Sequence, residues 1–151
     1  MDTETKPLVR GFRDFRWDEV EHRPYKDEGA APFKAISRQA LFDEPALGCE
    51  LRYFEMEAGG HSTLERHEHM HAVMILRGRG HCLIGETVRP VQPYGLVTIP
   101  AWTWHQFRAT EGETFGFLCM VNRLRDKPQL PTEQDLEALT QNPDVADFLA
   151  R

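Results

Sequence analysis

Three histidines, His67, His69 and His71, stand at alternate positions in the segment GGHSTLERHEHMHAVMILRGRG (59–80), and Glu65 precedes them by two. Side chains two residues apart share one face of a strand, so a regular strand would point all four side chains the same way. Buried polar groups cost free energy unless something satisfies them, and a bound cation would satisfy these. The pattern therefore predicts a metal site, and the alternative is a solvated histidine-rich loop.

Short apolar segments separated by turn residues surround this cluster. Between about residues 47 and 125, the segments CELRYFEME, HAVMIL, HCLIG, LVTIP, WHQFRA and TFGFLCMV alternate with GG, RGRG, GE, QPYG and TEGE. Strands punctuated by turns at this spacing are typical of a sandwich or a small barrel. We therefore expect an all-β body that positions the histidines.

The two flanks differ from this body. Residues 1–46 are rich in charge and proline and show no sustained period of 2 or 3.6, yet they carry too many aromatics for a solvated tail. We expect an ordered arm that lies on the domain, held by Phe12, Phe15, Trp17, Tyr25 and Phe33. Residues 126–151 predict a tail of two short helices, with Thr132 capping the first and Asn142-Pro143 starting the second.

Composition restricts the classes of protein to consider. The chain is 40% hydrophobic and 28% charged with a net charge of −6, and no basic cluster is denser than RLRDK, so neither nucleic acid nor a membrane is expected as a partner. The polar first residues predict no signal peptide. Three widely spaced cysteines, Cys49, Cys82 and Cys119, argue against a disulfide framework. We expect a single domain over residues 1–151 in the cytoplasm.

The spacing around the histidines resembles the first motif of the cupin superfamily, G-x5-H-x-H-x3,4-E-x6-G. Counted from Gly59 to Gly78, every interval of that motif is met. The residue types differ at two places, because Glu65 stands where the first histidine is usual and His71 where the glutamate is usual. The middle position is His67.

A second motif follows about 30 residues later. Cupins carry P-x-G-x2-H there, and Pro100 and His105 have that interval, with Trp102 where the glycine usually stands. The resemblance covers about residues 47–125. It implies a double-stranded β-helix (jelly-roll) barrel.

The cupin register implies that Glu65, His67, His71 and His105 are the metal ligands and leaves His69 in a turn between two strands. In the alternative, a regular strand, His67 and His69 bind the ion and Glu65 lies behind them. Three imidazoles and one carboxylate leave two open positions on an octahedral ion, which suits Mn²⁺ or Fe²⁺, although Zn²⁺, Ni²⁺ and Cu²⁺ accept the same ligand types. An open position implies chemistry on a substrate oxygen.

A cysteine in TFGFLCMVN is the candidate catalytic residue. Alternation places Cys119 on one face with Phe115, Phe117 and Val121. FLC resembles the last barrel strand of small manganese cupins, in which the cysteine points toward the metal. The alternative for Cys119 is a buried structural cysteine.

Basic and phenolic side chains offer sites for a charged substrate, such as a phosphate. The candidates are Arg52, Arg108 and Arg123 on the strands or their ends, and Tyr25 and Lys26 in the arm. The alternative for each is a solvated surface side chain.

Five segments, RQALF, TLERHEHMHAVMILRGRG, TWHQFRA, FLC and KPQLPTEQDL, resemble one subgroup of small cupins from bacterial methionine salvage. The resemblance implies a manganese enzyme that removes the methylthio group of 1-methylthio-D-xylulose 5-phosphate, with glutathione as the acceptor, and gives 1-deoxy-D-xylulose 5-phosphate. A dioxygenase, a sugar-phosphate isomerase and a non-catalytic ligand-binding cupin are the alternatives. Exposed strand edges predict a homodimer in which residues before about 46 contact the partner.

Overall fold

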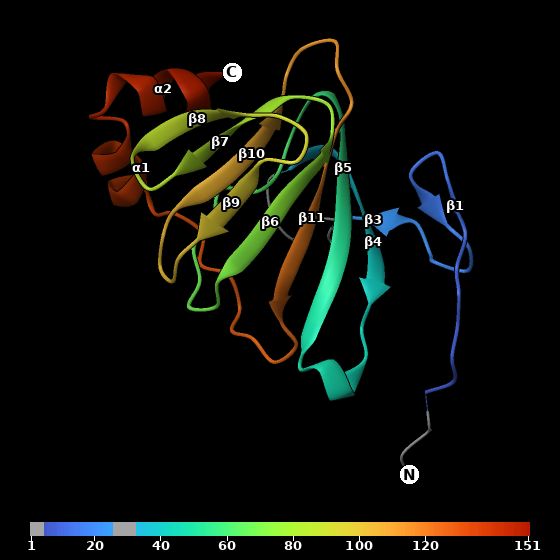
Figure 1. The fold of residues 1–151 in the computed structure, drawn as a ribbon. Coiled ribbons are helices and arrows are strands. Elements are labelled where there is room, and N and C mark those ends of the chain that lie inside the picture. Colours follow the sequence, from blue (N-terminus) through green and yellow to red (C-terminus); the bar gives the residue numbers. More distant parts are fainter. Residues whose placement is uncertain (1–4, 26–32) are drawn as a thin grey trace.

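A curled antiparallel sheet forms the body of this computed structural model, which describes residues 5–25 and 33–151 (Figure 1). The hydrogen-bonded strand order is β8-β7-β10-β5-β11-β6-β9, with β4 also beside β5 and β3 beside β4. The strands of this sheet are β3 (Arg23–Pro24), β4 (Lys34–Phe42), β5 (Cys49–His61), β6 (His71–Arg77), β7 (Gly80–Ile84), β8 (Thr87–Val91), β9 (Leu96–Ile99), β10 (His105–Ala109) and β11 (Phe115–Asn122). The architecture confirms the predicted all-β jelly-roll barrel.

Six strands, β5, β6, β7, β9, β10 and β11, lie where the sequence predicts strands. The additional strand β8 contains Pro90, which has no amide hydrogen for a ladder. β8 pairs only with β7 along the sheet and so occupies its edge, the place where a sheet tolerates proline. The proline accounts for the absence of a strand signal there.

The segment before residue 46 contributes to the sheet as well as forming an arm. β4 pairs with β5 from Lys34, opposite His61, to Phe42, opposite Leu51. The irregular register between them, with shifts at two places, matches the weak periodicity of its sequence. The division into arm, barrel and tail at residues 46 and 125 stays a prediction.

The arm covers the outer face of β5. A small hairpin of β1 (Phe12–Arg13) and β2 (Arg16–Trp17) lies beyond β4 (Figure 1). The ring of Phe15 stacks on Tyr53 with centroids 5.8 Å apart, and Trp17 meets the same ring edge-on at 5.3 Å. Gln39 on β4 donates a hydrogen bond to the carbonyl of Phe15 at 2.9 Å. The expected ordered arm is thus present in the described residues, and its aromatic rings bury Tyr53 completely.

Gly116 on β11 has no room for a side chain, because a Cβ there would overlap the hydroxyl of Tyr53. That hydroxyl donates a hydrogen bond to Glu55 at 2.8 Å, so it does not move freely. We expect Gly116→Ala to lower the free energy of unfolding by about 1–3 kcal/mol, the usual cost of overpacking. Denaturant titration would measure it beside Gly95→Ala, where the nearest neighbour is a carbonyl at 3.1 Å. Equal stability of Gly116→Ala and wild type would contradict the packing argument.

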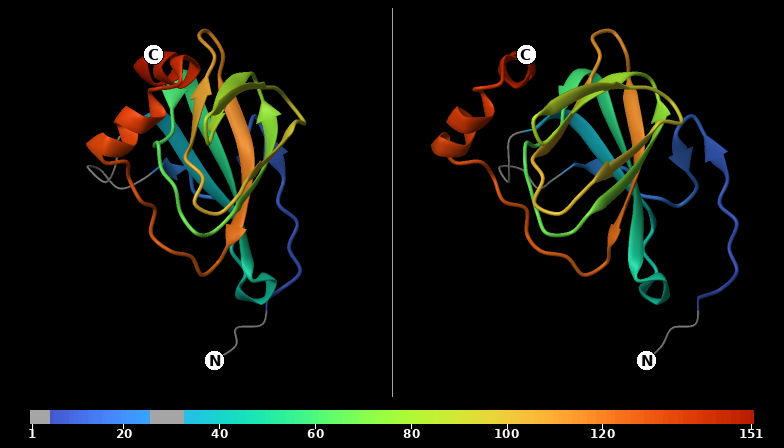
Figure 2. Two further views of the ribbon diagram at one scale, coloured as in Figure 1. Left: turned by 90° about the vertical axis from the view of Figure 1, so that its left-hand side faces the viewer. Right: turned by 60° about the vertical axis from the view of Figure 1, so that its left-hand side comes forward.

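The inward side chains of the strands form the main core, and a second apolar cluster joins the C-terminal helices to the barrel wall. The helices are α1 (Glu133–Leu139) and α2 (Pro143–Ala150), and they lie on the opposite side of the barrel from the β1–β2 hairpin (Figure 2). Thr132 forms a capping box with Asp135, and Asn142 caps α2, as the sequence predicts. Within the described residues, no helix has the length and apolarity that a membrane crossing requires.

Candidate metal centre and cavity

Direct backbone pairing brings the two histidine motifs together. The amide of Glu65 donates to the carbonyl of His105 at 3.2 Å, and the amide of His105 donates back to the carbonyl of Glu65 at 3.0 Å. The amide of Trp102 also donates to the carbonyl of His67 at 2.7 Å. Backbone hydrogen bonds alone therefore hold together two segments that are some 40 residues apart in sequence.

Five side chains gather where the motifs meet. The ligand atoms of Glu65, His67 and His105 all lie within 4.8 Å of one another, and so do those of His67, His69 and His71. The rings of His71 and His105 join the two groups, with centroids 5.2 Å apart. Glu65, His67 and His105 are only 5%, 1% and 4% exposed. Burial of a carboxylate among imidazoles favours a bound cation.

The chain between Glu65 and His71 is not a regular strand. Residues 68 and 69 form a bend, and β6 starts only at His71. His69 therefore lies in a turn, as the cupin register implies. Its side chain nevertheless returns to the cluster, where it stacks on His67 with ring centroids 3.7 Å apart.

Backbone carbonyls orient two of the rings. Nδ1 of His67 donates to the carbonyl of His69 at 2.6 Å, and Nδ1 of His105 donates to the carbonyl of Thr103 at 2.9 Å. A carbonyl can only accept, so in the neutral rings Nε2 carries the lone pair, which is the arrangement found in metal-binding histidines. Nε2 of His67 is buried and has no hydrogen-bond partner among the described residues. The donor set therefore fits a divalent metal ion.

Asp126 holds the bend that carries His69. Its carboxylate accepts hydrogen bonds from the amide of Glu68 at 2.8 Å, from the amide of His69 at 3.1 Å and from Nδ1 of His69 at 2.7 Å. These donors, the Glu68 amide first, hold the pKa of Asp126 well below its usual range. Asp126 follows β11 in a connecting segment with no motif of its own, so nothing in the sequence points to it.

Burial also sets the protonation of the cluster. It lowers the pKa of His67 to about 4, with the neighbouring charge of His105 acting in the same direction. The same two causes hold the pKa of His71 far below its usual range. Both rings are therefore neutral at physiological pH, which is the form that binds metal.

Cys119 lies in the wall of the same cavity, which has a volume of about 200 Å³. Its predicted face is confirmed, since Phe115, Phe117 and Val121 are buried with it in the core. Cys119 is paired directly opposite Arg52 in the β5–β11 ladder, and Nη2 of Arg52 donates to its Sγ at 3.5 Å. Burial raises the pKa of the thiol, and the positive charge of Arg52 opposes that rise.

The predicted substrate-binding candidates separate into two groups. Arg52 and Tyr25 line the cavity. Arg108 instead lies over the ring of Phe148 beside α2, and Arg123 pairs with Asp43 at 2.6 Å, so neither lines it. Lys26 lies outside the described residues.

Two arginines that no motif singles out, Arg38 and Arg125, also line the cavity. Arg38 lies in KAISRQALF, where Ile36, Arg38 and Ala40 share one strand face. An arginine between two apolar residues on such a face is the signal that could have identified it. Arg125 follows the end of β11, and only the path of that connection brings it to the cavity.

Comparison with known proteins gives relatives that span nearly the whole chain. A curated protein of Rhodospirillum rubrum, 1-methylthio-D-xylulose 5-phosphate methylsulfurylase, is 59% identical over 144 residues, which cover 93% of this chain and 92% of the relative. The crystal structure of a cupin 2 conserved barrel domain protein from Rhodopseudomonas palustris is 55% identical, covers 93% of this chain and 98% of that chain, and has a TM-score of 0.88.

A second crystal structure, of a cupin-2 domain from Rhodospirillum rubrum, is 56% identical and covers 96% of this chain and 97% of that chain, with a TM-score of 0.86. The family model described as a cupin domain matches residues 52–121, which include Glu65 and the four clustered histidines. The chain therefore belongs to the cupin family.

Proposed function

We propose that this protein is a metal-dependent enzyme that removes the methylthio group of 1-methylthio-D-xylulose 5-phosphate and gives 1-deoxy-D-xylulose 5-phosphate, with glutathione as the acceptor. The observation that carries the proposal is one cavity with a cluster suited to a metal on one wall and a thiol, Cys119, on another. The 59% identical relative with this substrate in its name supports it. The proposed ligands are Glu65, His67, His71 and His105.

Removal of the methylthio group by a thiol needs no outside oxidant. The acceptor gives up a proton, and its thiolate attacks the methylthio sulfur, so that a sulfur–sulfur bond forms. The bond between C1 and sulfur breaks, and its electron pair stays with C1, in conjugation with the C2 carbonyl. A proton then adds to C1, so carbon is reduced while sulfur is oxidised, and the second product is the methyl disulfide of the acceptor.

A divalent ion held by Glu65, His67, His71 and His105 would supply positive charge that stabilises the negative charge developing on the substrate oxygens. Burial keeps the rings of His67 and His71 neutral, and hydrogen bonds through Nδ1 fix the orientation of the His67 and His105 rings. Phe107 and Phe117, which stack with centroids 4.4 Å apart, line the cavity with apolar surface and would keep water away from C1 of the substrate.

The surroundings of Cys119 suit donation of the proton to C1. Because burial raises the pKa of this thiol, Cys119 keeps its proton at neutral pH. The thiolate left behind would lie beside the guanidinium of Arg52, whose Nη2 is 3.5 Å from Sγ, and would be stabilised by its charge. The proton released by the acceptor then restores the thiol.

Turnover and metal content would test the proposal together. Protein purified without added metal should contain Mn²⁺, with Fe²⁺, Zn²⁺ and Ni²⁺ as the competing ions, and it should convert the methylthio sugar phosphate only when a thiol is present. Chelation should abolish turnover, and Mn²⁺ should restore it. Oxygen uptake without thiol consumption, or isomerisation that keeps the methylthio group, would contradict the proposal in favour of another cupin activity.

We also propose a cytoplasmic homodimer in which residues before about 46 contact the partner. The arm exposes large apolar residues that a partner chain could cover, which supports this proposal. Leu8 is 62% exposed, Val9 96% and Phe12 56%. We expect light scattering at micromolar concentration to give the mass of two chains and deletion of residues 1–11 to shift the equilibrium toward the monomer. A wild-type monomer at this concentration would contradict the prediction.

The proposed cytoplasmic location is supported by the cysteines, which are all free and so fit a reducing compartment.

A further inference from the structure

We propose that Arg38, Arg52 and Arg125 form a phosphate-binding subsite, so that the substrate lies between these guanidinium groups and the histidine cluster. All three side chains line the cavity that also contains the histidines. The inference rests on the proposed function, because it assigns the phosphate end of the proposed substrate.

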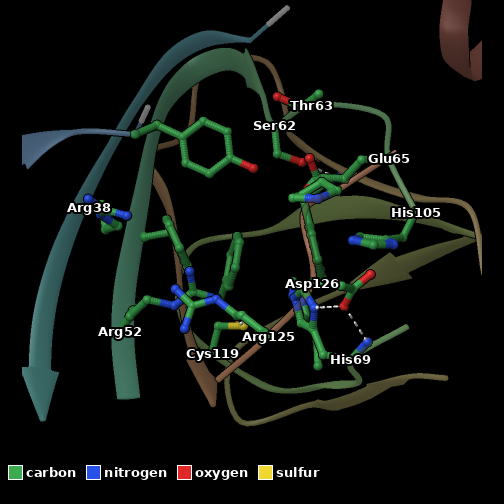
Figure 3. Close-up of a pocket in the computed structure, with 16 residues that line it drawn as sticks. Arg38, Arg52, Ser62, Thr63, Glu65, His69, His105, Cys119, Arg125 and Asp126 are labelled. Carbon is green, nitrogen blue, oxygen red and sulfur yellow. Dashed lines mark hydrogen bonds and ion pairs between the residues drawn. The ribbon is translucent and has the colours of Figure 1, made fainter. Parts of the chain in front are cut away.

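The sheet register brings two of the arginines to the same face. Phe54 on β5 points into the core, so Arg52, two residues before it, shares its face. Arg38 on β4 is paired directly opposite Phe54, which places Arg38 diagonal to Arg52 on that face. Arg125 reaches them from the segment after β11. Figure 3 shows the three side chains and Cys119 on one side of the cavity, with Glu65 and His105 on the other.

The charges on this side of the cavity suit a phosphate. Glu50 is the carboxylate shared by two of the arginines, 3.1 Å from Nη1 of Arg125 and 4.0 Å from Nε of Arg52. Three guanidinium groups and one carboxylate leave two positive charges, and a phosphate monoester carries about −1.5 to −2 at pH 7. The other acids that line the cavity, Glu65 and Asp126, belong to the histidine side.

Mutual repulsion of the arginines supports the same conclusion. Burial, followed by the positive charge of Arg52, lowers the pKa of Arg38. Among the described residues, no ion pair neutralises Arg38. An anion bound between the guanidinium groups would relieve this repulsion, and guanidinium groups bind phosphate oxygens in a fixed two-point geometry.

The order of the strands also matches an extended substrate. β6 starts at His71, β11 carries Cys119 and β5 carries Arg52, and these three strands are neighbours in the sheet. Two strand spacings amount to about 10 Å, and long side chains shorten that gap. A five-carbon sugar phosphate can therefore hold its phosphate on the arginines while its carbonyl end reaches the histidines past Cys119.

Kinetics of Arg38→Gln and Arg125→Gln would test the subsite. We choose these two because each is partly exposed, whereas Arg52 is buried against Cys119. Each variant should raise the KM for 1-methylthio-D-xylulose 5-phosphate by about 10- to 100-fold, the loss expected for charge-assisted hydrogen bonds. The KM for glutathione should stay unchanged, and lysine at either position should restore part of the loss. The matched control is Arg89→Gln, an exposed arginine on β8 outside the cavity.

Direct binding of inorganic phosphate to the manganese-loaded protein separates this inference from the proposed function. Calorimetry should show binding by wild type and Arg89→Gln and much weaker binding by the Arg38 and Arg125 variants, even if wild type failed to turn over the methylthio substrate. A rise in the KM for glutathione with no change for the sugar phosphate would overturn the inference, since the arginines would then bind carboxylates of the acceptor. Unchanged phosphate binding in both variants would also overturn it.

Discussion

Replacement of His67 with alanine is expected to lower the affinity for the metal by at least about 100-fold. Residues that only hydrogen-bond to a metal ligand already change metal affinity by about 10- to 100-fold, and loss of a ligand itself should cost at least as much. His67 belongs to both groups of clustered ligand atoms, the one with Glu65 and His105 and the one with His69 and His71. Its Nε2 is buried and has no hydrogen-bond partner among the described residues. His71→Ala and His105→Ala should cause similar losses. Metal analysis after exhaustive dialysis, with titration of Mn²⁺ into the chelated protein, would measure them.

His69→Ala is the matched control. The ring of His67 is oriented by the main-chain carbonyl of His69, which the substitution keeps. Asp126 likewise binds the amides of Glu68 and His69, so the bend keeps two of its three hydrogen bonds to that carboxylate. We therefore expect a loss of no more than about 10-fold. Equal losses in all four variants would instead make His69 a ligand, as the regular-strand alternative requires.

The geometry of the motifs was predictable because it depends on local spacing. Alternation along β11 is a property of any strand, so TFGFLCMVN alone groups Cys119 with Phe117 and Val121 on one face, and the resemblance to cupins implies that this face points inward. The caps of both helices follow from single residues, Thr132 and Asn142. In each case the deciding interaction lies within a few residues, where sequence patterns carry information.

The remaining parts of the site depend on contacts between distant segments. Asp126 fixes the bend at residues 68 and 69 through hydrogen bonds across 57 and 58 residues of sequence. Arg38 meets Arg52 only because β4 pairs with β5 in one register, and that register includes two irregular steps. No local sequence pattern determines the register of β4 against β5 or the path of the segment after β11. The positions of Arg38 and Asp126 in the site could therefore not be predicted from the sequence.

Replacement of Cys119 with serine or alanine is expected to lower kcat by about 100-fold or more while the metal content stays unchanged. This is the usual size of a general acid contribution, and the thiol is not among the proposed ligands. Serine is nearly isosteric, so the packing with Phe117 and Val121 in the core should persist. Steady-state and single-turnover kinetics with the methylthio substrate and glutathione would measure the loss.

The fate of the sulfur decides which role Cys119 has. As a proton donor it never bonds to the methylthio group, so mass spectrometry of quenched single turnovers should find unmodified Cys119, and the acceptor should carry all of the transferred sulfur. A methylthio adduct on Cys119 would instead make it the attacking thiol. In this reaction C1 keeps the electron pair of the C1–sulfur bond, so the group that attacks the sulfur becomes bonded to it. Full activity of both variants would leave Cys119 as a core residue, and C1 would then take its proton from another donor. The buried thiol beside Arg52 favours the first outcome, because burial keeps the proton on sulfur until negative charge develops at C1.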